Sequence, residues 1–169
     1  MFLYPKDYFE SVKDITIDYL NDHKIKALIL DVDNTLIDFD KKIPEGIDKW
    51  CEDLKKNNVK MFILSNSNKK DKVKMVAEQL DLPYSYLATK PLKRGLKKAI
   101  RYLNEKEENI AAVGDQIFTD VVGANRCKMY SILVKPIAHK DLLVTKFKRP
   151  LENLVIKRYL RSKNRKENK

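Results

Sequence analysis

Short apolar runs alternate with amphipathic stretches along most of the chain. The first run, residues 27–30, is too short to span a bilayer and too continuous for a strand with one face in water, so it is typical of a buried strand in a parallel sheet. Similar runs follow at 59–64, 85–88, 110–113 and 130–134. Between these runs, apolar residues recur every three or four positions, which predicts helices over 44–57, 69–80, 91–104 and 119–126. This order predicts an α/β fold with a Rossmann-like, doubly wound, mostly parallel sheet of five strands.

Two further helices are predicted, one near each end of the chain. Residues 6–22 carry apolar side chains at helical spacing, namely Tyr8, Val12, Ile15 and Tyr19. This helix either packs on the domain or lies on a membrane surface with the help of Phe2 and Leu3. A last helix over about 150–161 leads into a polar end. We therefore predict one domain over 1–160 and a basic, flexible tail over 161–169.

The charge of the chain is uneven. Its net charge is +11, from 35 Lys and Arg and 24 Asp and Glu. Residues 146–169 hold ten Lys or Arg and two Glu, or +8, which leaves only +3 for the rest of the chain. A basic segment of this kind favours an anionic partner, either a lipid surface or a nucleic acid.

The sequence shows no sign of secretion or of a membrane span. The start, MFLYPKDYFE, lacks the apolar core and small-residue cleavage site of a signal peptide, and no stretch approaches the ~20 apolar residues that cross a bilayer. Cys51 and Cys127 show no pairing pattern, so we expect reduced thiols. These features predict a cytoplasmic protein.

Polar side chains stand where four of the predicted strands end. In chain order, these residues are Asp31, Asp33, Ser65, Lys90, Asp115 and Asp120. Because parallel strands share one carboxyl edge, we expect these side chains to converge there. Burying carboxylates without a partner is costly, and an oxygen-rich group of carboxylates suits Mg²⁺. A serine hydroxyl and a lysine ammonium are phosphate-binding groups.

Some of these residues have a structural alternative. Ser65 is alternatively a cap for the helix over 69–80, although Asn68 fits that role better. Lys93 or Arg94 is an alternative source of the positive charge assigned to Lys90. Asp120 is alternatively a first-turn acid that stabilises the helix dipole.

Four segments of the chain, LDVDNTL, LSNS, ATKP and GDQIFTD, resemble in this order the four motifs of the haloacid dehalogenase-like superfamily. The superfamily pattern is D-x-D-x-T, then Ser, then Lys, then G-D-x-x-x-x-D, and Asn34 in place of the commoner Gly points to subfamily IIIA. LVKPI at 133–137, TKFKRPLE at 145–152 and the amino-terminal helix are similar to the YqeG family of phosphatases. They are similar also to the related mitochondrial phosphatidylglycerophosphate phosphatases. The resemblance covers residues 2 to about 160.

The resemblance implies a Mg²⁺-dependent phosphatase, and the chemistry of the residues agrees. Asp31 is expected to be the nucleophile that forms an aspartyl-phosphate. Asp33 is expected to protonate the leaving oxygen and then to deprotonate the attacking water. Ser65 and Lys90 are expected to bind the phosphoryl oxygens, with assistance from Asn66.

The resemblance also implies a set of metal ligands. They are a carboxylate oxygen of Asp31, the backbone carbonyl of Asp33 and the carboxylate of Asp115. Asp120 either joins this metal shell or orients Lys90.

The chain has no segment long enough for the cap domain that superfamily members with small substrates often insert. An open site admits a substrate attached to something large, and the basic tail favours an anionic surface. We therefore expect the lipid phosphatidylglycerophosphate as substrate, with peripheral contact at the inner membrane face through the tail. The alternatives are an RNA- or ribosome-associated binding protein on the same scaffold, or a phosphatase of a protein or a small metabolite.

Overall fold

A computed structural model describes residues 2–137 and 143–167. Six strands form one fully parallel sheet in the order β1-β6-β5-β2-β3-β4. The strands are β1 Asp7–Phe9, β2 Ala27–Leu30, β3 Lys60–Leu64, β4 Tyr84–Ser85, β5 Ile110–Gly114 and β6 Tyr130–Val134. All residues of β2 are buried between β5 and β3, as expected for an apolar run inside a parallel sheet.

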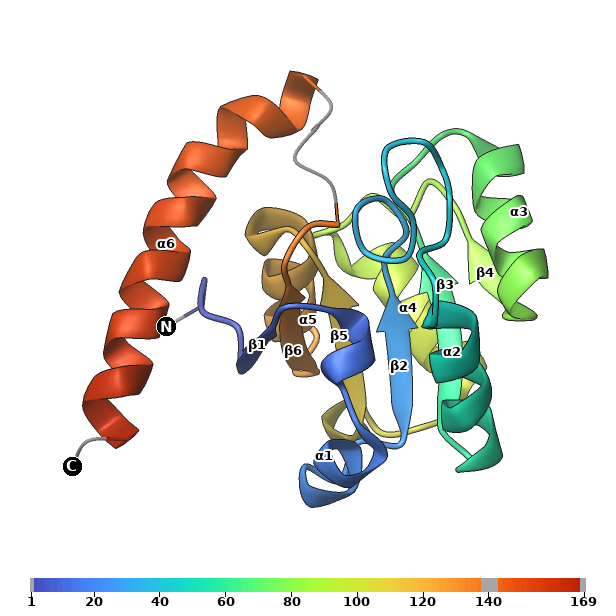
Figure 1. Ribbon diagram of the computed structural model, residues 1–169, viewed down its shortest axis with the longest axis horizontal. Helices are drawn as coiled ribbons and strands as arrows, with labels where there is room; N and C mark the ends of the chain where they lie inside the picture. The colour runs from blue at the N-terminus through green and yellow to red at the C-terminus, as the bar shows by residue number, and fades with distance from the viewer. Residues whose placement is uncertain (1, 138–142, 168–169) are drawn as a thin grey trace.

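Helices cover both faces of the sheet (Figure 1). One face packs against α1 (Ile17–Asp22), α2 (Ile47–Lys56) and α3 (Lys70–Leu80), and the other against α4 (Lys93–Leu103) and α5 (Val122–Arg126). The alternation along β2 explains the two cores, because Leu28 and Leu30 belong to the first core while Ala27 and Ile29 belong to the second. The predicted doubly wound α/β fold is confirmed.

The sheet has one strand more than predicted because the start of the chain is not a continuous helix. In place of a helix over 6–22, the chain forms β1, a 3₁₀ turn at Val12–Asp14 and the short helix α1. Ser11 and Thr16 interrupt the helix, since each side chain accepts a hydrogen bond from a backbone N–H and caps a new turn. Val12 lies in the first core, which favours packing on the domain over a membrane-surface helix.

The last helix is also longer than predicted. Helix α6 spans Leu143–Glu167, so it includes most of the segment expected to be a flexible tail. It lies beside the β1 edge of the sheet (Figure 1) and contacts the body through Tyr159, whose hydroxyl donates to the Lys6 carbonyl at 3.1 Å. The division into a domain and a flexible tail stays a prediction. Within the described residues, no helix combines the length and the apolar character needed to cross a bilayer.

Three neighbouring strands end at the same edge of the sheet. The chain leaves β2 at Asp31, β3 at Ser65 and β5 at Asp115, and β2 pairs with both of the other strands. Within residues 31–115, all of which the structure describes, no additional domain is inserted over this edge.

Candidate active site

Asp31 is buried directly after β2. Its backbone N–H donates to the Val113 carbonyl on β5 at 3.0 Å, which continues the sheet by one residue. Its Oδ1 accepts a hydrogen bond from Lys90 Nζ at 2.7 Å. The pKa of Asp31 is raised to about 7, because burial disfavours the carboxylate by more than the charge of Lys90 favours it. Asp31 is thus a carboxylate that needs a further positive charge to remain ionised.

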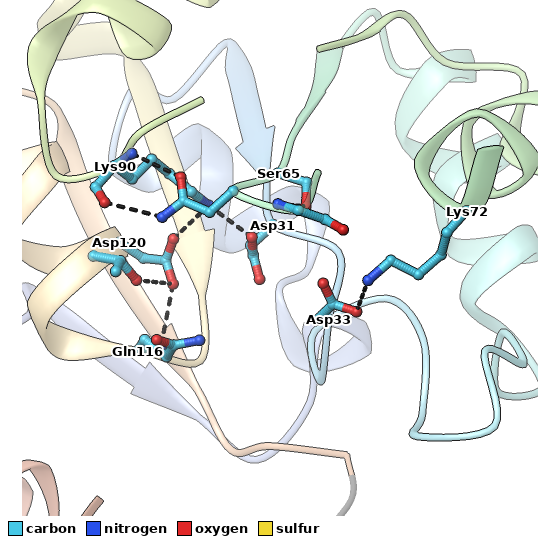
Figure 2. Close-up of polar contacts among 10 residues, drawn as sticks. Asp31, Asp33, Ser65, Lys72, Lys90, Gln116 and Asp120 are labelled. Atoms are coloured by element: carbon cyan, nitrogen blue, oxygen red, sulfur yellow. Dashed lines mark hydrogen bonds and ion pairs between the residues drawn. The ribbon is translucent and has the colours of Figure 1, made fainter. Parts of the chain in front are cut away.

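Lys90 connects two buried carboxylates (Figure 2). Its Nζ donates to Asp31 and also to Asp120 Oδ1 at 2.6 Å, and the three side chains are at most 9% exposed. Burial alone would lower the pKa of Lys90, but Asp120 and Asp31 outweigh burial and raise it. Lys90 therefore carries its positive charge inside the site, whereas the alternatives Lys93 and Arg94 are exposed on α4.

The side chain of Asn66 fixes the backbone of Lys90. Its Oδ1 accepts from the Lys90 N–H at 2.7 Å, and its Nδ2 donates to the Lys90 carbonyl at 2.9 Å. We predicted that Asn66 assists phosphate binding, but the structure engages both polar atoms of its side-chain amide with Lys90. Asn66 is therefore placed to position the lysine, a role that no local pattern in the sequence indicates.

Asp120 lies in a π-helical turn, Ile117–Val121, that follows β5. Its Oδ2 accepts from the backbone N–H of Gln116 at 3.2 Å (Figure 2), which fixes the carboxylate from the side opposite Lys90. A Cβ on Gly114 would lie 2.3 Å from Asp120 Cγ. Only glycine at position 114 therefore leaves Asp120 in place.

The carboxylates of Asp31, Asp115 and Asp120 form a compact buried cluster. Their oxygens lie within 4.8 Å of one another, and Lys90 contacts two of the three groups. Grouping three buried carboxylates is costly unless positive charge lies beside them, and Lys90 supplies such charge to Asp31 and Asp120. Carboxylate oxygens are the ligands that Mg²⁺ prefers, so these residues fit such an ion. Asp120 is placed for both of its predicted roles, in the metal shell and beside Lys90.

Ser65 stands next to Asp31 because β3 pairs with β2, with Ile63 opposite Leu30 (Figure 2). It is buried, and its Oγ accepts from the Ser67 N–H at 3.1 Å, which leaves the hydroxyl hydrogen available for donation. Ser65 does not cap the following helix, since the residue before α3 is Lys69, which makes no side-chain cap bond.

Asp33 lies at the mouth of the site and differs from the other acids. Its side chain is 36% exposed and accepts a hydrogen bond from Lys72 Nζ on α3 (Figure 2). The next residue, Asn34, adopts a left-handed conformation with φ of 59°, which turns the chain sharply after the acid. Lys72 could not be predicted from the sequence, because it is one of several lysines between 69 and 74 and no pattern distinguishes it.

Comparisons with known proteins point to one family. The family model described as "Mitochondrial PGP phosphatase" matches residues 1–138. The "Probable phosphatase YqeG" of Bacillus subtilis (strain 168) is 34% identical over 156 residues, which cover 92% of this chain and 90% of that relative.

Solved structures share the fold at low sequence identity. A hydrolase of the haloacid dehalogenase-like family from Brucella suis 1330 has a TM-score of 0.53 at 10% identity, over 71% of this chain and 93% of that one. An uncharacterized protein from Listeria monocytogenes serotype 4b has a TM-score of 0.55 at 16% identity, over 79% of this chain and 99% of that one. At such identities the likeness concerns the fold alone.

Proposed function

We propose that this chain, which belongs to the mitochondrial PGP phosphatase family and is a phosphatase of the haloacid dehalogenase type, hydrolyses phosphatidylglycerophosphate with Mg²⁺ through an aspartyl-phosphate. The observation that carries the reaction class is the buried Asp31, hydrogen-bonded to Lys90 within a cluster of three carboxylates. The match to the family supports the lipid substrate. The substrate is the finer part of the proposal and is tested separately from the chemistry.

The first step transfers the phosphoryl group to Asp31. A carboxylate oxygen of Asp31 attacks phosphorus in line while the bond from phosphorus to the leaving oxygen breaks, and Asp33 gives its proton to that oxygen. The 36% exposure of Asp33 supports this role, because its carboxyl group can reach a leaving group that enters from solvent. Water then attacks phosphorus and gives a proton to Asp33, while the bond from phosphorus to the Asp31 oxygen breaks. Phosphate leaves, and the Asp31 carboxylate and the protonated Asp33 are restored.

Other residues hold the transferring group. We expect Lys90 and the hydroxyl of Ser65 to donate to its oxygens, where negative charge gathers in the transition state, and the hydrogen bond of Lys90 to Asp31 supports this role. Asp31, Asp115 and Asp120, with the backbone carbonyl of Asp33, are the residues that would hold Mg²⁺. The bound ion supplies positive charge that offsets the repulsion between an anionic nucleophile and an anionic phosphate.

The open edge of the sheet supports a substrate attached to something large. Between β2 and β3, α2 is the one helix or strand, so no cap domain is inserted in this connection. We also propose that the protein has one domain over 1–160 followed by a basic tail. It is cytoplasmic in this proposal and contacts the inner membrane face peripherally. The intact carboxylates and Lys90 argue against a nucleic-acid-binding scaffold that has lost catalysis.

The test is phosphate release from phosphatidylglycerophosphate in mixed micelles. We expect release with Mg²⁺, its loss on chelation, its recovery when Mg²⁺ is restored, and a decrease of at least about 10⁴-fold for Asp31→Asn. Hydrolysis of an aryl phosphate without release from the lipid would overturn the substrate and leave the chemistry intact. In that case phosphoproteins and small phosphate monoesters are the next substrates to assay.

A further inference from the structure

Helix α4 presents a strongly basic surface. Its exposed residues include the cations Lys93, Arg94, Lys97, Lys98 and Arg101, and the helix contains no acidic residue. Arg94, Lys98 and Arg101 line a groove of about 500 Å³ between α4 and the segment that follows the edge strand β4. Every charged side chain that lines this groove is a cation, so the groove fits an anionic ligand.

The groove also has an apolar and a hydroxyl component. Leu87 lines it with 55% of its surface exposed, and Ser85 and Thr89 contribute hydroxyl groups. Lys98 Nζ lies 3.5 Å from Ser85 Oγ, so one cation is already directed toward β4. The groove thus combines cations, hydroxyl groups and one exposed aliphatic side chain.

The wall between the groove and the active site is a fixed loop, residues 86–90. Ala88 N–H donates to the Ser65 carbonyl at 3.0 Å, and Leu87 N–H donates to the Ser67 carbonyl at 3.0 Å. A Cβ on Gly95 would lie 2.4 Å from the Ala88 carbonyl oxygen, so α4 presses closely on the same loop. The loop ends at Lys90, whose Nζ donates to Asp31, so the groove and the active site lie on two sides of the same loop.

We propose that this groove and the exposed face of α4 dock the protein on an anionic phospholipid bilayer. Arg94, Lys98 and Arg101 contact headgroup phosphates, and Leu87 enters the boundary of the acyl chains. The inference rests on the proposed function in one respect, since docking on a bilayer brings the enzyme to its substrate only if that substrate is a lipid.

The side chains around the groove favour lipid over RNA. Single-stranded RNA is usually bound by aromatic rings on which bases stack. Tyr86, the one aromatic residue that lines the groove, packs against the first core. The ring of Tyr102, elsewhere on α4, is 64% exposed, but it lies 5.2 Å from the ring of Phe62 and does not line the groove. An exposed leucine among cations is instead typical of a surface that inserts shallowly into a bilayer.

The groove is also distinct from the basic helix at the end of the chain. Helix α6 lies beside β1, whereas the groove adjoins β4, and these two strands are at opposite edges of the sheet (Figure 1). Lys157, Arg158 and Arg161 are exposed on α6 and have the same total charge as the three cations of the groove. The chain therefore contains a matched control for the effect of net charge.

The experiment is co-sedimentation with phosphatidylcholine vesicles that contain about a third phosphatidylglycerol. Each cation near such a surface strengthens binding by about fivefold, so the triple variant Arg94→Gln, Lys98→Gln, Arg101→Gln should bind on the order of a hundredfold more weakly. The control variant Lys157→Gln, Arg158→Gln, Arg161→Gln should change binding less than about fivefold. Leu87→Ser, which leaves the charge unchanged, should weaken binding by about tenfold.

Three results would overturn the proposal. They are full binding by the groove variant, an equal loss in the α6 control, and a preference of the unaltered protein for single-stranded RNA over the vesicles. Thermal unfolding midpoints verify that each variant is folded, and Leu87→Ser tests the groove if the triple variant is not. The assay measures binding without turnover and is repeated with Asp31→Asn, so failure of docking and failure of the phosphatase proposal are separate outcomes.

Discussion

The active site has a buried half and an exposed half that are built differently. In the buried half, Lys90 is hydrogen-bonded to Asp31 and Asp120, and none of the three side chains is more than 9% exposed. In the exposed half, Asp33 and Lys72 form a single ion pair at the mouth, and 36% of the Asp33 side chain is exposed. The two halves meet at Asp31 and Asp33, which are separated by one residue of the chain.

The difference corresponds to what each half is proposed to do. A nucleophile and its metal ligands act from fixed positions, and buried groups with several partners are fixed because moving one of them leaves another charge unpaired. A proton donor must meet a leaving group and later a water molecule, which both arrive from solvent. The Lys72 side chain is 11% exposed and the Asp33 side chain 36%, so solvent and an arriving substrate reach this ion pair from the Asp33 side.

Apart from the loss of the nucleophile in Asp31→Asn, the largest expected effect belongs to the exposed half. Asp33→Asn should slow hydrolysis of an alkyl phosphate by about 10²–10⁴-fold, because a poor leaving group needs the proton that Asp33 supplies. An aryl phosphate leaves readily without a proton, so the variant should release aryl alcohol in one fast burst per enzyme molecule and then turn over slowly. Rapid mixing detects the burst. Its absence would mean that Asp33 supports the site in another way.

In the buried half, Asp120→Asn tests whether one carboxylate serves both the metal and Lys90. We expect kcat to fall by about a hundredfold and the Mg²⁺ concentration for half-maximal activity to rise, because the variant removes a charge from the cluster. The measurement is a Mg²⁺ titration of initial rates. An unchanged Mg²⁺ requirement would restrict Asp120 to the orientation of Lys90, whose hydrogen bond to it is 2.6 Å long.

Gly114→Ala tests how rigid the buried half is. The new Cβ would lie 2.3 Å from Asp120 Cγ and displace a carboxylate that Lys90 and Gln116 hold. We expect a loss of activity between about tenfold and a hundredfold, with unfolding free energy lower by about 1–3 kcal/mol.

The control for that variant is Gly123→Ala, whose Cβ would meet the end of the Leu96 side chain at 2.9 Å and Pro91 at 3.6 Å, and no carboxylate is among these nearest contacts. Thermal unfolding and kcat are measured for both. If both variants lose similar activity, general strain and not the position of Asp120 explains the effect.

The smallest effect is expected for Lys72→Met at the mouth. The ion pair positions Asp33 only weakly, so kcat/KM for an alkyl phosphate should fall by at most about fivefold. In an Asp33→Asn background the same substitution should change nothing further, because Lys72 acts through Asp33.

The matched control is Lys74→Met, which removes a different lysine of α3 from its pair with Glu78. A similar decrease from this control, or an additive loss in the double variant, would show that Lys72 acts independently of Asp33.

Much of the site follows from the sequence. The parts that do not follow from it have one common cause, which is how the loops fold. Asp31, Ser65 and Asp115 were predicted from their positions after apolar runs, since adjacent parallel strands bring their carboxyl ends together whatever the loops do. The role of Asn66 in phosphate binding stays a prediction, whereas its part in positioning Lys90 was not predicted. Its two hydrogen bonds to Lys90 depend on how the loop at 86–90 folds back onto β3.

The ends of the chain show the same limit. The apolar spacing of residues 6–22 is compatible with one helix, yet β6 offers a free edge with which Asp7–Phe9 pairs, and this tertiary contact outweighs the local pattern. The helix at the other end was predicted too short. The sequence assigned the contact with an anionic lipid surface to this basic end of the chain. The same contact is now proposed for the groove on α4, which no pattern along the sequence indicates.

By itself, the sequence determined the parallel sheet, the two acids after its central strand and the reaction class that they favour. The alternation of apolar runs and helices permits few other arrangements. The tertiary structure decided which of the many lysines serve the site. Lys72 lies 39 residues from Asp33 and Lys90 lies 59 residues from Asp31, so both pairs depend on how the helices and loops pack against the sheet. Charge in a sequence is only a count, and folding determines which charges are buried together and which remain in water.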